Sequence, residues 1–165
     1  MELLELNNVY KSFSNKEVLK NINLTIPRGK IIGLLGRNGQ GKTTIIKLIN
    51  DLLTPTKGEI LVNGKKIGVE SKKIISYLPE RTYLDKNMKL IDVLKCFEEF
   101  YDNFDIKKAK KLLKDLDLDI NQKLVNMSKG MQEKVQLVLV MSRKADLYIL
   151  DEPLGGVDPA TRDYI

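Results

Sequence analysis

A glycine-rich loop set between an apolar run and a helical pattern most constrains what this chain can fold into. Residues 36–43 read Gly-Arg-Asn-Gly-Gln-Gly-Lys-Thr and fit the pattern G-x-x-x-x-G-K-[ST]. The five residues before the loop, 31–35, form an apolar run of strand length, and residues 44–49 predict the first turns of a buried helix. A strand, a tight glycine loop and a helix together present backbone N–H groups and a positive helix end to phosphate. The alternative is an ordinary glycine-rich turn followed by a helix. A complete motif match with a strand before it and a helix after it makes a phosphate-binding loop the favoured interpretation.

The last two residues of the loop carry the chemistry that a nucleoside triphosphate needs. The Lys42 ammonium supplies a positive charge for the β- and γ-phosphates, and the Thr43 hydroxyl is placed to ligate a magnesium ion. We therefore predict binding of a nucleotide together with Mg²⁺.

A second acidic element lies near the end of the chain. Four apolar or aromatic residues, 147–150, predict a buried strand, and Asp151 and Glu152 follow it directly. A strand end places Asp151 beside the phosphate loop, where it can hold Mg²⁺ through water. Glu152 then lies near the γ-phosphate and can orient and deprotonate an attacking water. Two acids that cap a strand are common on their own, but in a chain with a phosphate loop the functional interpretation is favoured.

Composition excludes several classes of protein. The chain has 165 residues, which is enough for one domain with a core, and its 42% hydrophobic fraction is typical of a globular protein. No apolar run approaches the length of a membrane span, and the N-terminus lacks the features of a signal peptide. The lone Cys96 fits a cytosolic protein. The net charge of +6 comes mostly from lysine, without an arginine cluster, so no nucleic-acid partner is expected.

Periodicity predicts an α/β fold with three parts. A parallel-sheet core is expected to hold residues near 30–53, 74–79 and 144–165, a small antiparallel β region most of 1–27 and 58–70, and a helical insert about 88–125. The predicted strands are 2–10, 18–26, 30–35, 58–62, 67–69, 74–78 and 147–151, with Asn63-Gly64 as a hairpin turn. The predicted helices are 41–53, 90–101, 105–118, 129–143 with Ser128 as its N-cap, and one that begins near Pro159.

With these motifs in this order, the whole chain resembles the nucleotide-binding domain of ATP-binding cassette (ABC) transporters. Residues 36–43 match the Walker A motif, and residues 147–152 match the Walker B motif with its catalytic glutamate. Residues 127–131 match the family signature, which is usually Leu-Ser-Gly-Gly-Gln, and residues 156–158 match the D-loop. The resemblance implies a P-loop NTPase fold that binds ATP and Mg²⁺.

The resemblance also assigns roles to single residues. It implies that Glu152 catalyses hydrolysis with the help of Lys42 and Glu80, and that Thr43, Asp151 and Glu80 lie at the metal. It implies nucleotide contacts from Phe13, which would stack on adenine, and from Gly36, Asn38, Gly39, Gln40, Gly41, Lys42, Thr43, Thr44, Ser128, Gly130 and Asp158. Ser128 and Gly130 would contact ATP held by a second copy, since the family closes two domains head to tail around two ATP molecules. Ser128 is also explained as a helix cap, and Phe13 as an ordinary surface or core aromatic.

Three departures from the family pattern shape the expected function. Lys129 and Met131 replace a glycine and a glutamine of the signature, and Glu80 replaces the glutamine of the Q-loop. A similar Pro-Glu occurs in the antibiotic and multidrug export branch, so an exporter is favoured. The chain has no histidine, whereas the family carries a switch histidine downstream of the D-loop. We therefore expect a C-terminally truncated form, a poor ATPase on its own.

The leading interpretation is the ATPase subunit of an ABC exporter, cytoplasmic and peripheral on the inner face of the cell membrane, that works with a separate transmembrane subunit. One alternative is a soluble ABC protein that acts in translation or DNA repair. Another is a fragment that binds nucleotide without turnover.

Overall fold

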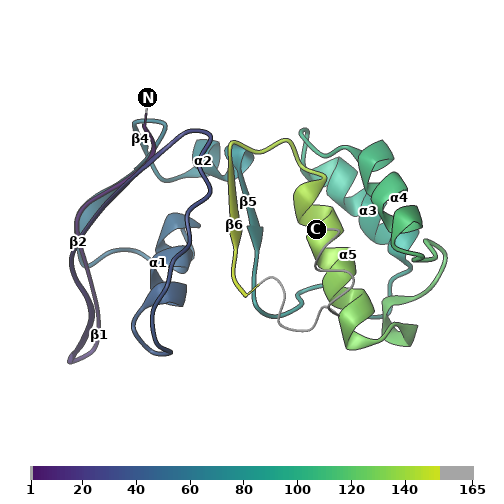
Figure 1. Cartoon of the computed structure of the whole chain (residues 1–165), viewed down its shortest axis with the longest axis horizontal. Coiled ribbons are helices and arrows are strands. Elements are labelled where there is room, and N and C mark those ends of the chain that lie inside the picture. The colour runs from purple at the N-terminus through teal and green to yellow at the C-terminus, as the bar shows by residue number, and fades with distance from the viewer. Residues whose placement is uncertain (1, 153–165) are drawn as a thin grey trace. The chain divides into compact units, whose positions relative to one another are not determined.

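The computed structural model describes residues 2–152, which form two compact units that divide between Ile75 and Ser76. Each unit has its own sheet and its own helices (Figure 1). The combination of an antiparallel sheet, a parallel strand pair and packed helices confirms the predicted α/β class. Within these residues no helix is both long and apolar enough to pass through a bilayer.

The N-terminal unit is built on a four-stranded antiparallel sheet with the order β2-β1-β3-β4. Its strands are β1 (Glu2–Phe13), β2 (Lys16–Pro27), β3 (Lys57–Val62) and β4 (Lys65–Lys66). In β1, Leu4 and Leu6 are buried, and the next buried residue is Val9, three positions further on rather than two. The pairing register with β2 also shifts between Leu6 and Val9. An extra residue in one strand produces such a change of face. The structure confirms the predicted strands at 2–10, 18–26 and 58–62.

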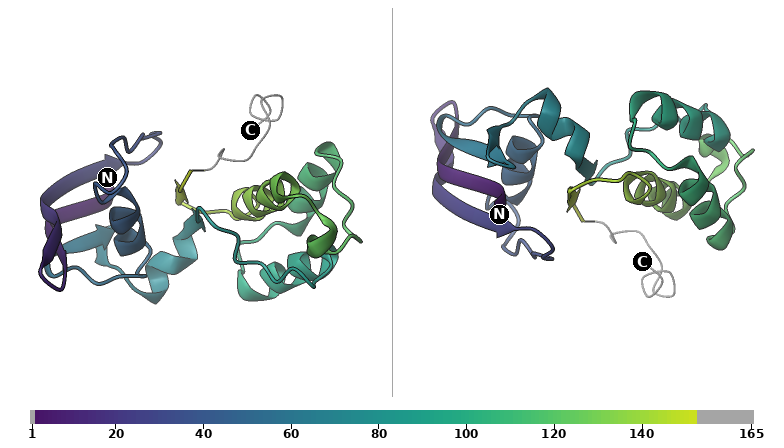
Figure 2. Two further views of the ribbon diagram at one scale, coloured as in Figure 1. Left: turned by 90° about the horizontal axis from the view of Figure 1, so that it is seen from below. Right: turned by 90° about the horizontal axis from the view of Figure 1, so that it is seen from above.

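Helix α1 (Lys42–Ile49) lies against this sheet in both views (Figures 1 and 2). It buries Ile45, Ile46, Leu48 and Ile49, as the apolar pattern after the loop predicts. The prediction that the helix continues to Leu53 is wrong. Asp51 adopts the left-handed conformation (φ 57°), and the Leu52 N–H donates to the Lys47 carbonyl at 2.9 Å. A left-handed residue with this bond is a common way to end a helix.

The hairpin after β3 turns at Asn63-Gly64 as predicted, with φ of 52° and 69°. Two residues with positive φ form the tight turn that matches strand twist, so the return strand must begin at once. Lys65 and Lys66 therefore pair with Val62 and Leu61. The prediction of a return strand at 67–69 is wrong, because helix α2 (Val69–Ile74) begins there.

Residues 30–35 do not form the predicted strand of the parallel core. The side chains of Ile31 and Leu35 are 103% and 92% exposed. A strand is stabilised by hydrogen bonds to a neighbouring strand. Among the described residues, the two sheets are completed by β1 to β4 and by β5 with β6, and neither pairs with this run. The prediction of a strand was based on the length and apolar character of residues 30–35, and these do not ensure that another strand lies beside them to form hydrogen bonds.

The C-terminal unit has a parallel pair of short strands, β5 (Ile75–Leu78) and β6 (Leu147–Leu150) (Figure 1). Its helices are α3 (Leu90–Phe100), α4 (Ile106–Asp115), the short η1 (Leu124–Asn126) and α5 (Lys129–Met141). These helices lie where they were predicted, but α4 ends three residues before the predicted residue 118 and α5 ends two residues before the predicted residue 143. The part of the predicted core beyond residue 152, including the helix near Pro159, lies outside the described residues.

Helix α5 is the centre of this unit because it is buried on two sides. Val135, Val138 and Leu139 pack in a cluster with residues of α3, α4 and η1. Leu137 and Val140 pack with Leu78 at the end of β5. The cluster with the other helices holds fully buried leucines, each worth about 1.5–3 kcal/mol of transfer free energy: Leu90, Leu94, Leu113, Leu124 and Leu139.

Two polar caps fix the starts of the helices. The Asp105 carboxylate accepts from the Lys108 N–H at 2.9 Å and begins α4. The Ser128 hydroxyl accepts from the Met131 N–H at 3.2 Å and begins α5, as predicted. Capping satisfies helix N–H groups that have no partner within the helix.

Candidate functional site

The glycine loop of the N-terminal unit ends at Gly41, the N-cap of α1. Gly41 has φ 91°, a conformation that L side chains rarely adopt, and a Cβ there would lie 2.6 Å from the Leu19 Cδ2 atom of β2. The backbone conformation therefore favours glycine at this position, and a Cβ would also require the Leu19 side chain to shift. The result is a helix N-terminus that is approached by a tightly curled, exposed loop.

Lys42 folds back over the loop rather than pointing away from it. Its Nζ donates to the carbonyl oxygens of Gly36 at 2.6 Å and of Arg37 at 3.0 Å. Gln40 closes the same turn, because its Oε1 accepts from the Arg37 N–H at 2.9 Å. An ammonium at a helix N-terminus is a favourable partner for a negatively charged group at the same place. Thr43 is exposed in the first turn of α1, beside Thr44.

Phe13 ends β1 in the same unit and is 44% exposed. The Lys11 Nζ lies 4.9 Å from the centroid of its ring and also donates to the Thr54 carbonyl at 2.8 Å. An exposed aromatic ring with a fixed cation nearby offers a flat surface for stacking. This arrangement is compatible with the predicted role and also with an ordinary surface aromatic.

In the C-terminal unit, the acids meet at the carboxyl ends of the two parallel strands. The Asp151 N–H donates to the Leu78 carbonyl at 2.9 Å, so the residue after β6 lies beside the last residue of β5. Asp151 is 8% exposed, whereas Glu80 and Glu152 are exposed. Glu152 has φ 52°, a strained conformation for glutamate. Strained residues are frequent at functional sites.

These three acids line one cavity of about 790 Å³ with residues from the first turns of α5. The other lining residues are Leu78, Pro79, Arg81, Thr82, Lys86, Lys129, Gln132, Glu133 and Gln136. Ser128 and Gly130 are outside this lining, and Ser128 is exposed at the start of α5. The Ser128 side chain is exposed to solvent and Gly130 is half-buried, so the start of α5 is accessible to another molecule. The predicted Asp158 lies outside the described residues.

Two residues of this region were not singled out from the sequence. Burial, followed by the negative charges of Asp151 and Glu80, raises the pKa of Tyr77, so its hydroxyl stays protonated as a donor. Gln136 is 2% exposed within a helix whose neighbours are apolar. A glutamine inside the apolar run 135–140 is a signal that the sequence contained.

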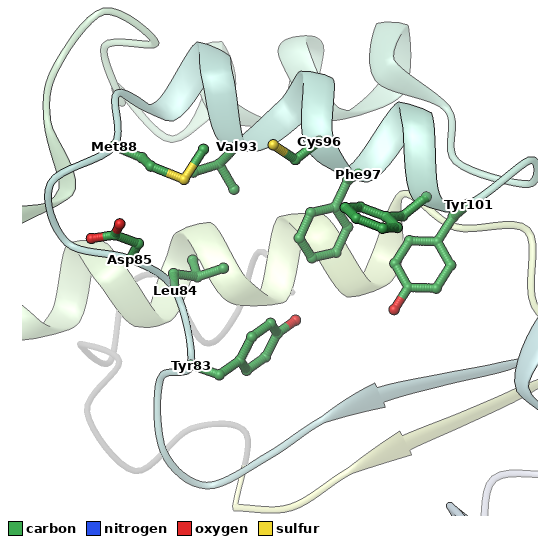
Figure 3. Close-up of a pocket in the computed structure, with 9 residues that line it drawn as sticks. Tyr83, Leu84, Asp85, Met88, Val93, Cys96, Phe97 and Tyr101 are labelled. Atoms are coloured by element: carbon green, nitrogen blue, oxygen red, sulfur yellow. The ribbon is translucent and has the colours of Figure 1, made fainter.

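A second, apolar cavity of about 340 Å³ lies along α3 in the same unit. Figure 3 shows Phe97 of α3 and Tyr101, the residue after α3, on one side of the cavity. Tyr83, from the loop after β5, lies on the other side. Phe100, which also lines the cavity, is 81% exposed. Arg143 stacks on Tyr101, with its guanidinium carbon 3.9 Å from the ring centroid, and fixes that wall.

The chain was compared with known proteins. A profile of the ABC transporter family matches residues 19–155. The ABC transporter ATP-binding protein YtrB of Bacillus subtilis is 35% identical over 165 residues, which cover 97% of this chain and 56% of YtrB. The chain therefore spans about half the length of this relative.

Two relatives from the same organism carry transport roles in their names. The SkfA peptide export protein SkfE is 31% identical and covered to 72%, and the manganese transport protein MntB is 32% identical and covered to 67%. The alignments cover 100% and 96% of this chain.

Solved structures give the same answer for the fold. The ATP-binding subunit of an ABC transporter superposes with a TM-score of 0.89 at 30% identity, over 98% of this chain and 70% of that one. Its fold is that of the P-loop ATPases, as predicted from the glycine loop. On the profile match and these relatives, the chain belongs to the ABC transporter family, among its ATP-binding proteins.

Proposed function

We propose that this chain is the part of an ABC transporter subunit that binds and hydrolyses ATP. The observation that carries the proposal is the glycine loop, in which Gly41 caps α1 and the Lys42 ammonium folds over the loop. The backbone N–H groups of the loop and the positive end of α1 suit a triphosphate. Gly36, Asn38, Gly39, Gln40 and Thr44 complete the proposed nucleotide contacts, and Phe13 the adenine contact.

The residues of the C-terminal unit suit magnesium rather than a metal held by protein alone. In the described part of the chain, no group of three or more His, Cys, Asp or Glu residues is arranged to hold a metal ion. Mg²⁺ is usually bound by one or two carboxylates together with waters and substrate phosphates. Asp151 and Glu80 of this unit are the proposed residues, together with Thr43 of α1 in the N-terminal unit. When bound, the ion neutralises charge on the β- and γ-phosphates.

Glu152 is the proposed general base. It follows Asp151 directly, lines the same cavity and is exposed, so a water in this cavity can reach its carboxylate. A carboxylate accepts the proton of the attacking water as the water oxygen bonds to the γ-phosphorus, while the bond from that phosphorus to the β-phosphate oxygen breaks and ADP leaves. Lys42 stabilises the negative charge of the phosphate oxygens during this step.

The proposed partners follow from family membership and two exposed features. Ser128 and Gly130, outside the cavity of their own chain, are proposed to contact ATP on a second copy in a head-to-tail dimer. A separate membrane subunit is proposed to insert an apolar side chain between Tyr83 and Tyr101, where Phe100 is exposed. The protein would then work at the cytoplasmic face of the membrane. The named relatives include a peptide export protein and a manganese transport protein, so they do not decide the direction of transport. The proposal of export therefore depends on Pro79-Glu80 alone.

Calorimetry with Mg²⁺ and ATP tests the proposal. The chain is expected to bind ATP, and Lys42→Ala is expected to weaken binding by tenfold or more, because it removes a charged contact worth about 1.5–3 kcal/mol. Lys47→Ala, on an exposed position of the same helix, serves as the control. Equal affinity of the unaltered chain and Lys42→Ala would refute the assignment of the loop.

A further inference from the structure

Helix α4 of the C-terminal unit carries a row of lysines on its exposed side. The lysines are spaced i, i+3, i+4 and i+7, so they share one side of the helix and form what is here the lysine row: Lys107, Lys110, Lys111 and Lys114. The opposite side of α4 buries Ala109 and Leu113 in the cluster with residues of α3 and α5. The helix therefore has an apolar side that is covered by its own unit and a basic side that is open to solvent.

The lysine row makes α4 less stable rather than more. Lys107 and Lys111 are like charges at i, i+4, and such pairs repel each other. Lys110 and Lys114 form a second pair of the same kind. The first turn of α4 has no acid, so Lys107 lies at the positive end of the helix dipole without compensation. Within residues 2–152, none of the four ammonium groups has an ion pair or a hydrogen bond. Folding of this unit therefore does not explain the row.

A fifth lysine of α4 shows what a structural role looks like on this helix. The Lys108 Nζ donates to the Met141 carbonyl at 2.7 Å, at the end of α5. A cation at a helix C-terminus satisfies a carbonyl that has no partner in the helix and interacts favourably with the dipole. Lys108 thus joins two helices, whereas the lysine row joins nothing in the described part of the chain.

We propose that the lysine row binds the surface of a membrane that contains anionic phospholipids. The inference goes beyond the proposed function, because no residue of the row belongs to the proposed nucleotide site. Clusters of four or more lysines on an amphipathic helix attract acidic lipid headgroups, and each lysine contributes a factor of about five in affinity. Since the apolar side of α4 is buried in the core, the helix does not insert between the lipids, and the attraction is electrostatic.

The residue types of the lysine row favour lipid over a protein or nucleic-acid partner. Interfaces with proteins are enriched in arginine and aromatic residues and depleted in lysine. Single-stranded nucleic acids are bound by aromatic side chains on which the bases stack, and arginine forms bidentate contacts with duplex bases. The row contains neither residue type. Flexible point charges suit a surface of mobile headgroups, which requires no fixed geometry.

The test is sedimentation of the whole chain with vesicles of phosphatidylcholine, made with and without phosphatidylglycerol. Binding is expected only with the anionic lipid and should be lost at high salt, which screens exposed charges. The variant that replaces the whole row should bind at least about 100-fold more weakly, since four charges are lost. It combines Lys107→Gln, Lys110→Gln, Lys111→Gln and Lys114→Gln. Without vesicles it should melt at the same temperature as the unaltered chain or higher, because the repulsion is removed.

The matched control removes four exposed lysines from the sheet of the N-terminal unit, so that the net charge falls by the same amount. It combines Lys20→Gln, Lys57→Gln, Lys65→Gln and Lys66→Gln. Its binding should weaken by no more than about fivefold. Equal weakening of the two variants would mean that net charge rather than α4 is responsible, and would overturn the proposal. Absence of binding to the anionic vesicles would also overturn it, as would tighter binding, through the same row, to duplex DNA or to polyglutamate.

Discussion

The Asp151 N–H donates to the Leu78 carbonyl at 2.9 Å, and this bond joins two residues that lie far apart in the chain. It brings the segment after β5, with Glu80, to the same edge as the segment after β6, with Glu152. Helix α5 packs on Leu78 and adds Gln136 to that edge. The carboxyl ends of parallel strands are where ligands bind in open α/β sheets.

Glu152→Gln is expected to bind ATP with little change but to hydrolyse it about 10²- to 10⁴-fold more slowly, because the amide cannot accept the proton of water. The measurement is the rate of single-turnover ATP hydrolysis, made in the full-length parent protein. Glu133→Gln is the control, since Glu133 lines the same cavity and pairs with Lys129 at 3.6 Å, and it should retain turnover. Turnover close to that of the unaltered protein in Glu152→Gln would exclude this residue as the base.

Gly41→Ala is expected to destabilise the N-terminal unit by more than the roughly 1–2 kcal/mol that a left-handed conformation costs, because the new Cβ also meets Leu19 at 2.6 Å. Gly39→Ala is the matched variant. Gly39 has φ 81° and no atom within 4 Å of a Cβ, so only the backbone cost applies. Urea unfolding of both variants gives the difference, and equal losses of stability would show that the contact with Leu19 does not matter.

The amides of residues 30–35 are expected to exchange hydrogen with solvent much faster than those of β1. This run has no strand partner among the described residues, whereas β1 is bonded on both sides by β2 and β3. Hydrogen exchange followed by mass spectrometry on peptides from the two segments is the measurement. Slow exchange in 30–35 would mean that the segment forms a strand in solution.

The stability of the C-terminal unit is expected to fall as the pH rises from about 10 to about 12, in part because of Tyr83. Burial, with a smaller effect from Tyr101, raises the pKa of Tyr83 to about 12. The unfolded chain therefore loses this proton first, and the stabilisation present below pH 10 is lost as the pH passes through the folded pKa. Since 53% of Tyr83 remains exposed, the effect should be modest.

Tyr83→Phe removes the titrating group and should show a shallower fall in this range. Urea unfolding at a series of pH values compares the two proteins. Parallel curves for the unaltered chain and Tyr83→Phe would contradict the shift in pKa.

The sequence by itself determined the features that depend on neighbours in the chain. The loop at 36–43 predicted a phosphate-binding fold because its glycines permit the tight curl that presents backbone N–H groups to phosphate. Ser128 predicted the start of α5, and Asn63-Gly64 predicted a tight turn, since capping and turn chemistry act over three or four residues. The family follows from these local motifs and their order.

Only the tertiary structure decided what depends on distant partners. Residues 30–35 have the composition of a buried strand, but among residues 2–152 no strand pairs with them, so the strand predicted from the apolar pattern is wrong. Gln136 looked like one polar residue in an apolar helix, but the structure buries it and places it with Asp151 among the residues of one cavity. Strand pairing and burial are set by contacts between segments far apart in sequence, and no local pattern specifies them.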